Sequence, residues 1–376
     1  MSTTAKTSRT RKPSPPTLDE LRRYAIARSL FKPTTLPRAI ARLGFVQADP
    51  MRAPARAQDL ILRHRVSGYR AGDLEQRYAR LKIEEDCLVN YGFVERRTLA
   101  LLHPREARRS WDAKTREQAE QLLAAVRQRG PTHPKHLLEE FAHHGRQAGY
   151  WGGELNVSTQ LLDGLHYRGQ LRVKRRDNGT RVYEAIAHPE QDQSPAARTQ
   201  RAEALLDMVL ALYAPLTAAS FGYLTSLLGY GAPHLRAETR AAFKRAKQRY
   251  AHAQIEGQTW YWPADENPRS RRHAADAQLR LLAPFDPVVW DRRRFELFWG
   301  WAYRFEAYTP AAKRQMGHYA LPLLWGEEMP GWANLRVDKG RLRHELGFTG
   351  ARPRSAAFRL ALEEELARIE QFLGLA

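Results

Sequence analysis

An amide and a carboxylate two positions apart, Gln47 and Asp49, are the residues of this sequence best suited to chemistry. They lie in the segment Phe45–Asp49, which follows a short amphipathic pattern that ends at Gly44, and we expect this segment to be extended. Because side chains alternate along an extended chain, both would project from one face, with Cβ atoms about 6.5–7 Å apart. The pair could then share one water molecule. The carboxylate would accept its proton and stabilise a cationic sugar, and the amide would orient it.

A purely structural role explains the same residues. Asp49 followed by Pro50 is a good N-cap and first-turn pair for a helix. The spacing by itself does not decide between a cap and a catalytic pair. The enzymatic hypothesis requires that both side chains face an open, positively charged surface rather than packed protein.

Other common catalytic signatures are absent from the sequence. It contains no Walker loop, no GxGxxG, no HExxH and no GxSxG. The histidines at 133, 136, 143 and 144 have no acids or cysteines at ligand spacing, so we expect surface histidines and no metal site. The single cysteine, Cys87, excludes an internal disulfide and has no evident base partner. We therefore predict neither a metal nor a cofactor.

The charge balance indicates a polyanionic partner. The chain has 376 residues, with 61 lysines and arginines against 41 acids, a formal charge of +20. No run of 18 apolar residues is present, and the segment Met1–Pro16 is a basic arm without the apolar core of a secretion signal. We expect a monomer that binds double-stranded DNA, does not enter membranes, and lies in a reducing cytoplasm in association with the nucleoid.

The elements that would position these residues form a repeated pattern. Residues 111–190 read as three helices, the last ending at Gly169, followed by two alternating runs around Asn178-Gly179, a strong hairpin signal. Three helices and a hairpin are the winged-helix order. We predict an α+β fold of tandem winged helix-turn-helix modules with a C-terminal β-barrel-like domain. The expected divisions are 1–16 (disordered arm), 17–110 (first module, with the Gln-x-Asp motif), 111–190 (second), 196–275 (third) and 278–376 (β domain).

Within these divisions, some elements are less regular. We expect helices near residues 55–66 and 73–102 and a last helix over 355–373. Aromatic and β-branched runs predict strands at 285–290, 303–308, 319–325 and 332–337.

The hairpin of the second module has the composition of a phosphate-binding wing. Arg172, Lys174 and Arg176 alternate with Leu171 and Val173, which makes one face of the strand cationic. The alternative is a solvated edge strand kept soluble by its charge. We favour DNA contact because the net charge and the module order agree with it.

The sequence also resembles a known family. Gln47-Ala-Asp49, the wing segment Arg181–Tyr183, and above all the blocks 282–292, 303–314 and 317–324 are similar to winged-helix DNA glycosylases of the AlkZ/YcaQ type. The resemblance implies a concave DNA cradle, metal-independent excision of alkylated purines, and opening of DNA interstrand crosslinks. It also implies that Asp49 and Gln47 are the catalytic pair. The side chains expected to bind DNA are Arg52, Arg56, Arg168, Lys174, Arg175, Arg176, Arg181, Lys313 and Arg314.

The leading hypothesis is therefore a monofunctional DNA glycosylase that hydrolyses the N-glycosidic bond of alkylated purines, unhooks interstrand crosslinks, or does both. One alternative is a winged-helix DNA-binding protein without catalysis, regulatory or architectural, which would prefer one sequence by about 4–10 kcal/mol over nonspecific DNA. Another is an RNA-binding protein, because net charge does not distinguish polyanions.

Overall fold

The structure is a computed structural model that describes residues 14–107, 110–148 and 154–375, so most of the basic arm predicted at 1–16 lies outside the described residues. The fold begins with helix α1 (Leu18–Ser29). Thr17 accepts a hydrogen bond from the Glu20 amide, and the Glu20 carboxylate accepts one from the Thr17 amide. This capping box starts the helix at the residue where the sequence places it.

The first unit of the fold contains the candidate site. Its elements are α2 (Leu36–Leu43), β1 (Phe45–Gln47), α3 (Ala57–Leu62), α4 (Asp73–Arg77), β2 (Ile83–Cys87), β3 (Tyr91–Glu95) and α5 (Leu99–Leu102). The three strands form an antiparallel sheet in which β3 lies between β1 and β2. The single helix predicted over 73–102 is therefore wrong: its two ends are the short helices α4 and α5, but its middle is the hairpin β2–β3. The helix predicted over 55–66 is correct only for its central turns.

Distant arginines explain why an acidic segment forms a buried strand. Glu84 and Glu85 of β2 are each 2% exposed. Arg172 donates to Glu84 at 2.6 Å, and Arg176 donates to Glu85 at 2.7 Å. Buried carboxylates need such partners. These partners lie 88 and 91 positions further along the chain, beyond the reach of any local pattern.

The second and third units follow the predicted order of elements. The second has α6 (Ala113–Arg129), α7 (Pro134–Glu140), the ribbon β4 (Arg146–Ala148) and β5 (Glu154–Asn156), α8 (Val157–Tyr167), β6 (Leu171–Asp177) and β7 (Thr180–Ala185). The third has α9 (Pro195–Tyr213), β8 (Leu216–Thr217), α10 (Ala218–Gly231), α11 (Arg236–Lys244), α12 (Ala246–Arg249), β9 (Ala251–Ile255) and β10 (Gln258–Trp262). The turn of β6–β7 has Asn178 and Gly179 at positive φ, as an Asn-Gly hairpin requires.

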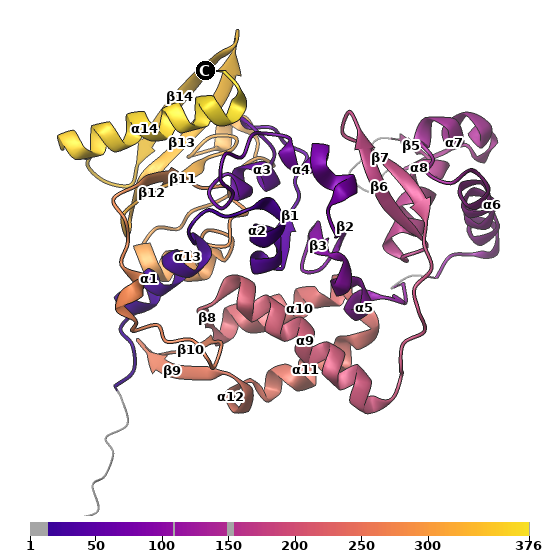
Figure 1. Cartoon of the computed structure of the whole chain (residues 1–376), viewed down its shortest axis with the longest axis horizontal. Coiled ribbons are helices and arrows are strands. Elements are labelled where there is room, and N and C mark those ends of the chain that lie inside the picture. Colours follow the sequence, from indigo (N-terminus) through magenta and orange to yellow (C-terminus); the bar gives the residue numbers. More distant parts are fainter. Residues whose placement is uncertain (1–13, 108–109, 149–153, 376) are drawn as a thin grey trace, which may run out of the picture.

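One strand arrangement recurs in all three units. In each, a short extended segment follows the first helix and later pairs with the second strand of a hairpin. The pairs are β1 with β3, Thr132 with Tyr183 of β7, and β8 with β10. In Figure 1 the first unit occupies the middle, with the second unit to the right, the third below and the C-terminal part to the left.

The C-terminal part is an open sheet rather than the expected barrel. It consists of β11 (Leu279–Leu281), α13 (Arg292–Trp299), β12 (Leu321–Trp325), β13 (Glu328–Asp338), β14 (Arg341–Phe348) and α14 (Ala356–Leu373). The described strands pair antiparallel in the order β11-β12-β13-β14, with β11 and β14 as edges. In Figure 1 the hairpin β13–β14 extends outward past α14.

The strands predicted at 285–290 and 303–308 are wrong. The first is a turn in which the Asp286 side chain accepts from the Val288 amide and its carbonyl accepts from Trp290. Asp291 then caps α13 through the amides of Arg293 and Arg294. Asparagine and aspartate side chains stabilise such turns against a strand.

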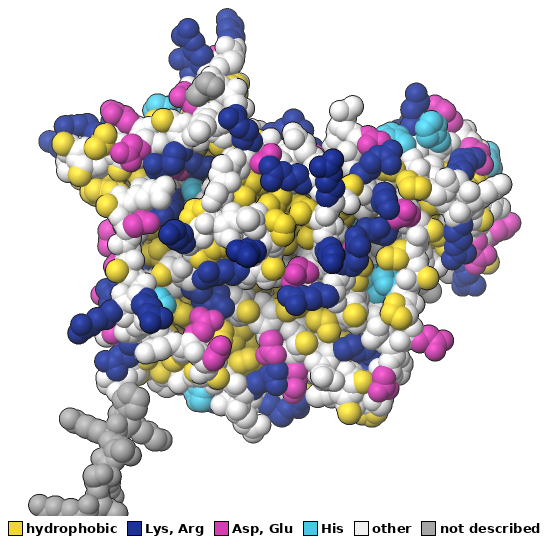
Figure 2. Space-filling model, in the orientation of Figure 1, with side chains coloured by type: hydrophobic (Ala, Val, Ile, Leu, Met, Phe, Trp, Pro, Cys, Tyr) yellow, Lys and Arg dark blue, Asp and Glu magenta, His cyan; other side chains and the backbone are white. Residues whose placement is uncertain are grey.

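A buried ion pair joins the first unit to the C-terminal part. Arg65 and Asp286 are both fully buried, with two guanidinium–carboxylate distances of 2.8 and 2.9 Å. Arg65 also donates to the carbonyls of Ser29 and Ile61. On the outside, lysine and arginine side chains are spread across the middle of the face in Figure 2, with hydrophobic side chains between them.

Candidate active site

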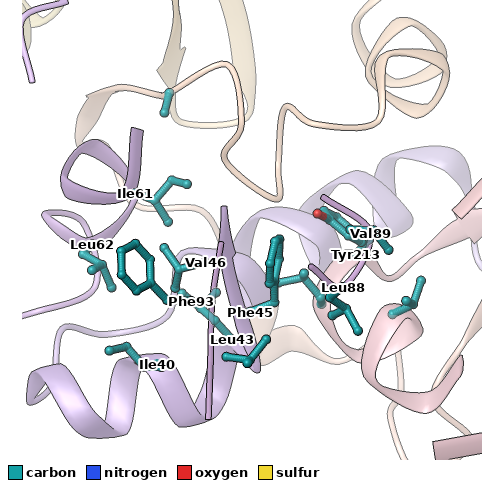
Figure 3. Packing of buried hydrophobic residues seen from close by; sticks show 14 of the residues in the cluster. Ile40, Leu43, Phe45, Val46, Ile61, Leu62, Leu88, Val89, Phe93 and Tyr213 are labelled. Atoms are coloured by element: carbon teal, nitrogen blue, oxygen red, sulfur yellow. The ribbon is translucent and has the colours of Figure 1, made fainter. Parts of the chain in front are cut away.

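Strand β1 leads the chain into the candidate site. Gln47 pairs with Gly92 of β3, and the Ala48 amide donates to the Tyr91 carbonyl at 3.0 Å, so the extended path continues past the strand. A side chain at position 92 would collide with the Val46 carbonyl, which explains the glycine there. Figure 3 shows the hydrophobic side chains that hold this strand in place, among them Ile40, Leu43, Phe45, Val46, Ile61, Leu62, Phe93 and, from the neighbouring α9, Tyr213.

Asp49 is half-buried at the start of the loop that follows β1. Its Oδ1 accepts a hydrogen bond from the Met51 amide at 2.9 Å, and its own amide donates to Oε1 of Gln58 at 3.3 Å. Burial raises the pKa of the Asp49 carboxyl, and the Met51 hydrogen bond partly opposes that rise. Within the described part of the chain, no cationic side chain forms an ion pair with Asp49. The carboxylate is thus held in place but not neutralised.

The interpretation of Asp49 as a helix cap is wrong. Helix α3 begins only at Ala57, after the N-cap position at Arg56. Asp49 instead closes a tight turn with the amide two residues ahead. After this turn the chain continues to Arg52.

Gln47 is more buried than the enzymatic hypothesis predicted. It is 4% exposed, and its Oε1 accepts a hydrogen bond from the indole nitrogen of Trp290 at 2.7 Å. Of the two side chains expected on an open face, therefore, Asp49 is partly open and Gln47 is covered. The bond to Trp290 occupies the Gln47 carbonyl oxygen, which leaves its amide NH₂, a donor, as the group able to orient a water molecule.

Tyr319 is a third polar residue at this site, and it is not among the residues that the sequence predicts there. Its hydroxyl is buried and has no hydrogen-bond partner among the described residues. Burial raises its pKa, and the nearby negative charge of Asp49 raises it further. Tyr319 lies in the block 317–324, one of those on which the family resemblance depends. That position is the sequence signal that could have identified it.

A larger cavity of about 1080 Å³ lies elsewhere, beside the N-terminal segment. The cavity relevant to this site is the one that the loop after Asp49 lines. It measures about 800 Å³ and is bounded by Arg52–Pro54, Gly317–Tyr319 and the hairpin β13–β14. Its cationic lining side chains are Arg52, Arg336 and Arg343, with Glu345 as the acid. The loop that carries Asp49 therefore runs along the rim of a positively charged hollow.

The expected DNA-binding residues of this region differ in availability. Arg52 and Lys313 are exposed, and neither forms an ion pair with a described acid. Arg56 is paired with Glu75, and desolvation lowers its pKa. Arg314 donates from Nε to the Thr309 carbonyl at 2.7 Å.

Three cations of the hairpin β6–β7, the predicted wing, bind other groups of the protein itself. Arg172 and Arg176 bind the buried carboxylates of β2, and Arg181 lies 4.5 Å over the Tyr91 ring and 2.9 Å from Asp163. Through these contacts with β2 and β3, the arginines hold the hairpin β6–β7 against the first unit.

The remaining cations expected to bind DNA in this unit, Lys174, Arg175 and Arg168, lie beside an acid or an aromatic ring. Lys174 and Arg175 are the more exposed of the wing cations; they lie 3.2 Å from Glu184 and 2.9 Å from Asp177 respectively. Arg168 stacks over Trp111 at 3.5 Å.

The described residues contain neither a cluster of metal-binding side chains nor a helix able to span a membrane. Over residues 14–107, 110–148 and 154–375, no three or more histidine, cysteine, aspartate or glutamate side chains group as they would around a metal ion. Within the same residues, no helix combines the length and apolar character needed to cross a bilayer.

Comparison with known proteins identifies the class. A profile of the family described as DNA glycosylase AlkZ-like matches residues 40–372, so the chain belongs to the AlkZ-like DNA glycosylase family and is a DNA-binding repair protein of that class. The fold is similar to that of the DNA glycosylase AlkZ of Streptomyces sahachiroi, with a TM-score of 0.60 and 14% sequence identity. The match covers 96% of this chain and 98% of that one.

Proposed function

We propose that the protein is a monofunctional DNA glycosylase that hydrolyses the N-glycosidic bond of alkylated purines in duplex DNA. The observation that carries this proposal is the half-buried Asp49 carboxylate, which forms no ion pair with a described residue and begins the loop whose residues Arg52–Pro54 line a positively charged hollow. An unneutralised, desolvated carboxylate costs folding free energy, and such groups are frequent in active sites.

The chemistry needs few groups. A purine alkylated at N7 is already cationic, so it leaves without a general acid, and positive charge then develops on the sugar. The Asp49 carboxylate stabilises that charge and accepts the proton of the attacking water. The Gln47 amide NH₂ donates to the same water and keeps a lone pair directed at the sugar carbon. This reaction requires neither a metal nor a cofactor.

The rest of the fold supports a duplex. We interpret the three recurring units as tandem winged helices, because each has a helix, an extended segment, at least two further helices and a hairpin, with the extended segment paired to the last strand. Arg52, Lys174, Arg175 and Lys313 would bind phosphates at points around the first unit. The hollow of about 800 Å³ lined by Arg52–Pro54 would hold a crosslinked base that cannot enter a deep pocket.

Base release from a defined lesion tests the proposal. Duplex DNA with one N7-methylguanine is incubated with the protein and then heated in alkali, which cleaves the strand at each abasic site. We expect strand cleavage at the lesion position that grows with protein concentration and exceeds spontaneous loss. A protein that binds this duplex and releases no base would instead be a DNA-binding protein without this activity. A second duplex with an N7-linked interstrand crosslink tests unhooking.

A further inference from the structure

The most exposed large hydrophobic side chain of the described residues is Tyr308. It is 78% exposed, whereas the next in order, Leu360, is 58% exposed. Tyr308 lies in the segment between α13 and β12 that includes the short 3₁₀ helix Ala311–Lys313. A single exposed apolar side chain is common on protein surfaces, so it indicates a ligand only where other features of a binding site accompany it.

The loop that presents Tyr308 is braced from inside. The carboxylate of Glu306, 6% exposed, accepts hydrogen bonds from the amides of Gln315 at 2.9 Å and Met316 at 2.8 Å. The Thr309 amide donates to the Glu306 carbonyl at 2.9 Å. Three hydrogen bonds thus fix this loop, and Tyr308 lies in the turn between Glu306 and Thr309.

A chain of ring contacts connects this turn to the candidate active site. The rings of Tyr308 and Phe305 meet edge to face with centroids 6.1 Å apart, and Phe305 meets Tyr319 in the same way at 5.3 Å. Tyr319 lines the hollow together with Arg52–Pro54, three to five residues after Asp49. Both Asp49 and Tyr308 contribute to the raised pKa of Tyr319, as expected if both lie beside it.

Cations flank the exposed ring. Arg304 and Lys313 are exposed on either side of it in the sequence, and neither forms an ion pair with an acid in the described ranges. Arg314 is half-buried and turns toward the loop through Thr309. An exposed ring on a segment that also carries exposed arginine and lysine side chains fits a nucleic-acid strand, with a base on the ring and phosphates on the cations. It does not fit an apolar protein partner, which would leave the cations unpaired.

We propose that Tyr308 is a base-stacking residue, whose ring packs on a nucleobase that leaves the duplex stack next to the lesion. The inference rests on the proposed function only for the position of the lesion at Asp49. Stacking of a base on an aromatic side chain depends on the π-face of the ring, so the hydroxyl is not required. Loss of the ring should therefore cost affinity for an unpaired base, and loss of the hydroxyl should not.

Binding of two duplexes tests this assignment. One carries a single unpaired base and the other is fully paired, and neither has a lesion, so the readout does not depend on base release. Tyr308→Ala should weaken binding of the first duplex by about 5- to 150-fold relative to wild type and leave the second nearly unchanged. Tyr308→Phe should bind both like wild type. The salt dependence of binding should be the same in all three proteins, because no phosphate contact is lost.

Leu360→Ala, on the outer face of α14, is the matched control for loss of an exposed apolar side chain and should not alter either affinity. The inference is overturned if Tyr308→Ala binds the unpaired-base duplex like Leu360→Ala does, or if Tyr308→Phe is as weak as Tyr308→Ala. A decrease in the salt slope of Tyr308→Ala would also overturn it. A stacking effect without base release from N7-methylguanine would reject the glycosylase and retain the stacking site, so the two failures are separable.

Discussion

Replacing Asp49 by asparagine removes a single charge from the candidate site and leaves its geometry in place. The Met51 amide, 2.9 Å from Oδ1, can donate to the side-chain oxygen of an asparagine as it does to the carboxylate. The amide of residue 49 still donates to Gln58. Because the carboxylate is partly desolvated and forms no ion pair with a described residue, its loss should not reduce the free energy of unfolding at neutral pH.

The expected loss of activity follows from the charge. A carboxylate about 4 Å from the cationic sugar, at an effective dielectric constant of about 20, stabilises it by about 4 kcal/mol. That energy corresponds to a decrease of about a thousandfold in the rate of base release. Binding of undamaged duplex should remain near the wild-type value, or become slightly tighter, since one negative charge is removed from a cationic surface.

The assay is single-turnover release of N7-methylguanine from duplex DNA, with spontaneous release subtracted. Asp192→Asn is the matched control, because the Asp192 side chain also accepts from the amide two residues ahead, that of Ser194, at 2.8 Å and lies outside the site. We expect Asp192→Asn to release base like wild type. If Asp49→Asn and wild type release base at the same rate, the carboxylate takes no part in the reaction and the assignment is refuted.

Three further predictions use other parts of the structure. Base release should fall as the pH decreases through the pKa of Asp49, since only the ionised form acts, and burial should place the midpoint above that of a free aspartate; a rate independent of pH in this range would argue against Asp49. Replacing Lys174 and Arg175 together by alanine should lower the salt slope of duplex binding by up to about two, and an unchanged slope would show that neither touches phosphate. Asp286→Asn should lower the free energy of unfolding by about 3–5 kcal/mol in denaturant titrations, because it leaves Arg65 buried without its partner; a loss below about 1 kcal/mol would contradict the importance of this pair.

Local signals in the sequence were sufficient for elements that depend on near neighbours. The capping box at Thr17, the helices of the second and third units and the Asn178-Gly179 turn all lie where the sequence predicts them. The last helix also begins and ends within one residue of the expected range. Caps, turns and apolar periodicity act over a few residues, so a single sequence carries them in full.

The candidate site was only partly predictable. The sequence identified Asp49 and Gln47, and the family resemblance gave them a role. It placed both on an open face, whereas Trp290, 243 positions away, covers Gln47. Likewise, Arg176 and Arg181 look like phosphate ligands in the alternating wing, yet they hold the hairpin against the first unit.

What the sequence by itself determined is a basic, multi-unit DNA-binding chain with a carboxylate after an extended segment. Only the tertiary structure decided which charged side chains remain available to bind DNA, because long-range packing determines which arginine pairs with each buried acid. Glu85 and Arg176, 91 residues apart, illustrate this: neither the strand nor the role of the arginine is visible until the two are brought together. Pairing across the fold, which cancels the cost of burying charge, is a property of the folded chain and not of any local segment.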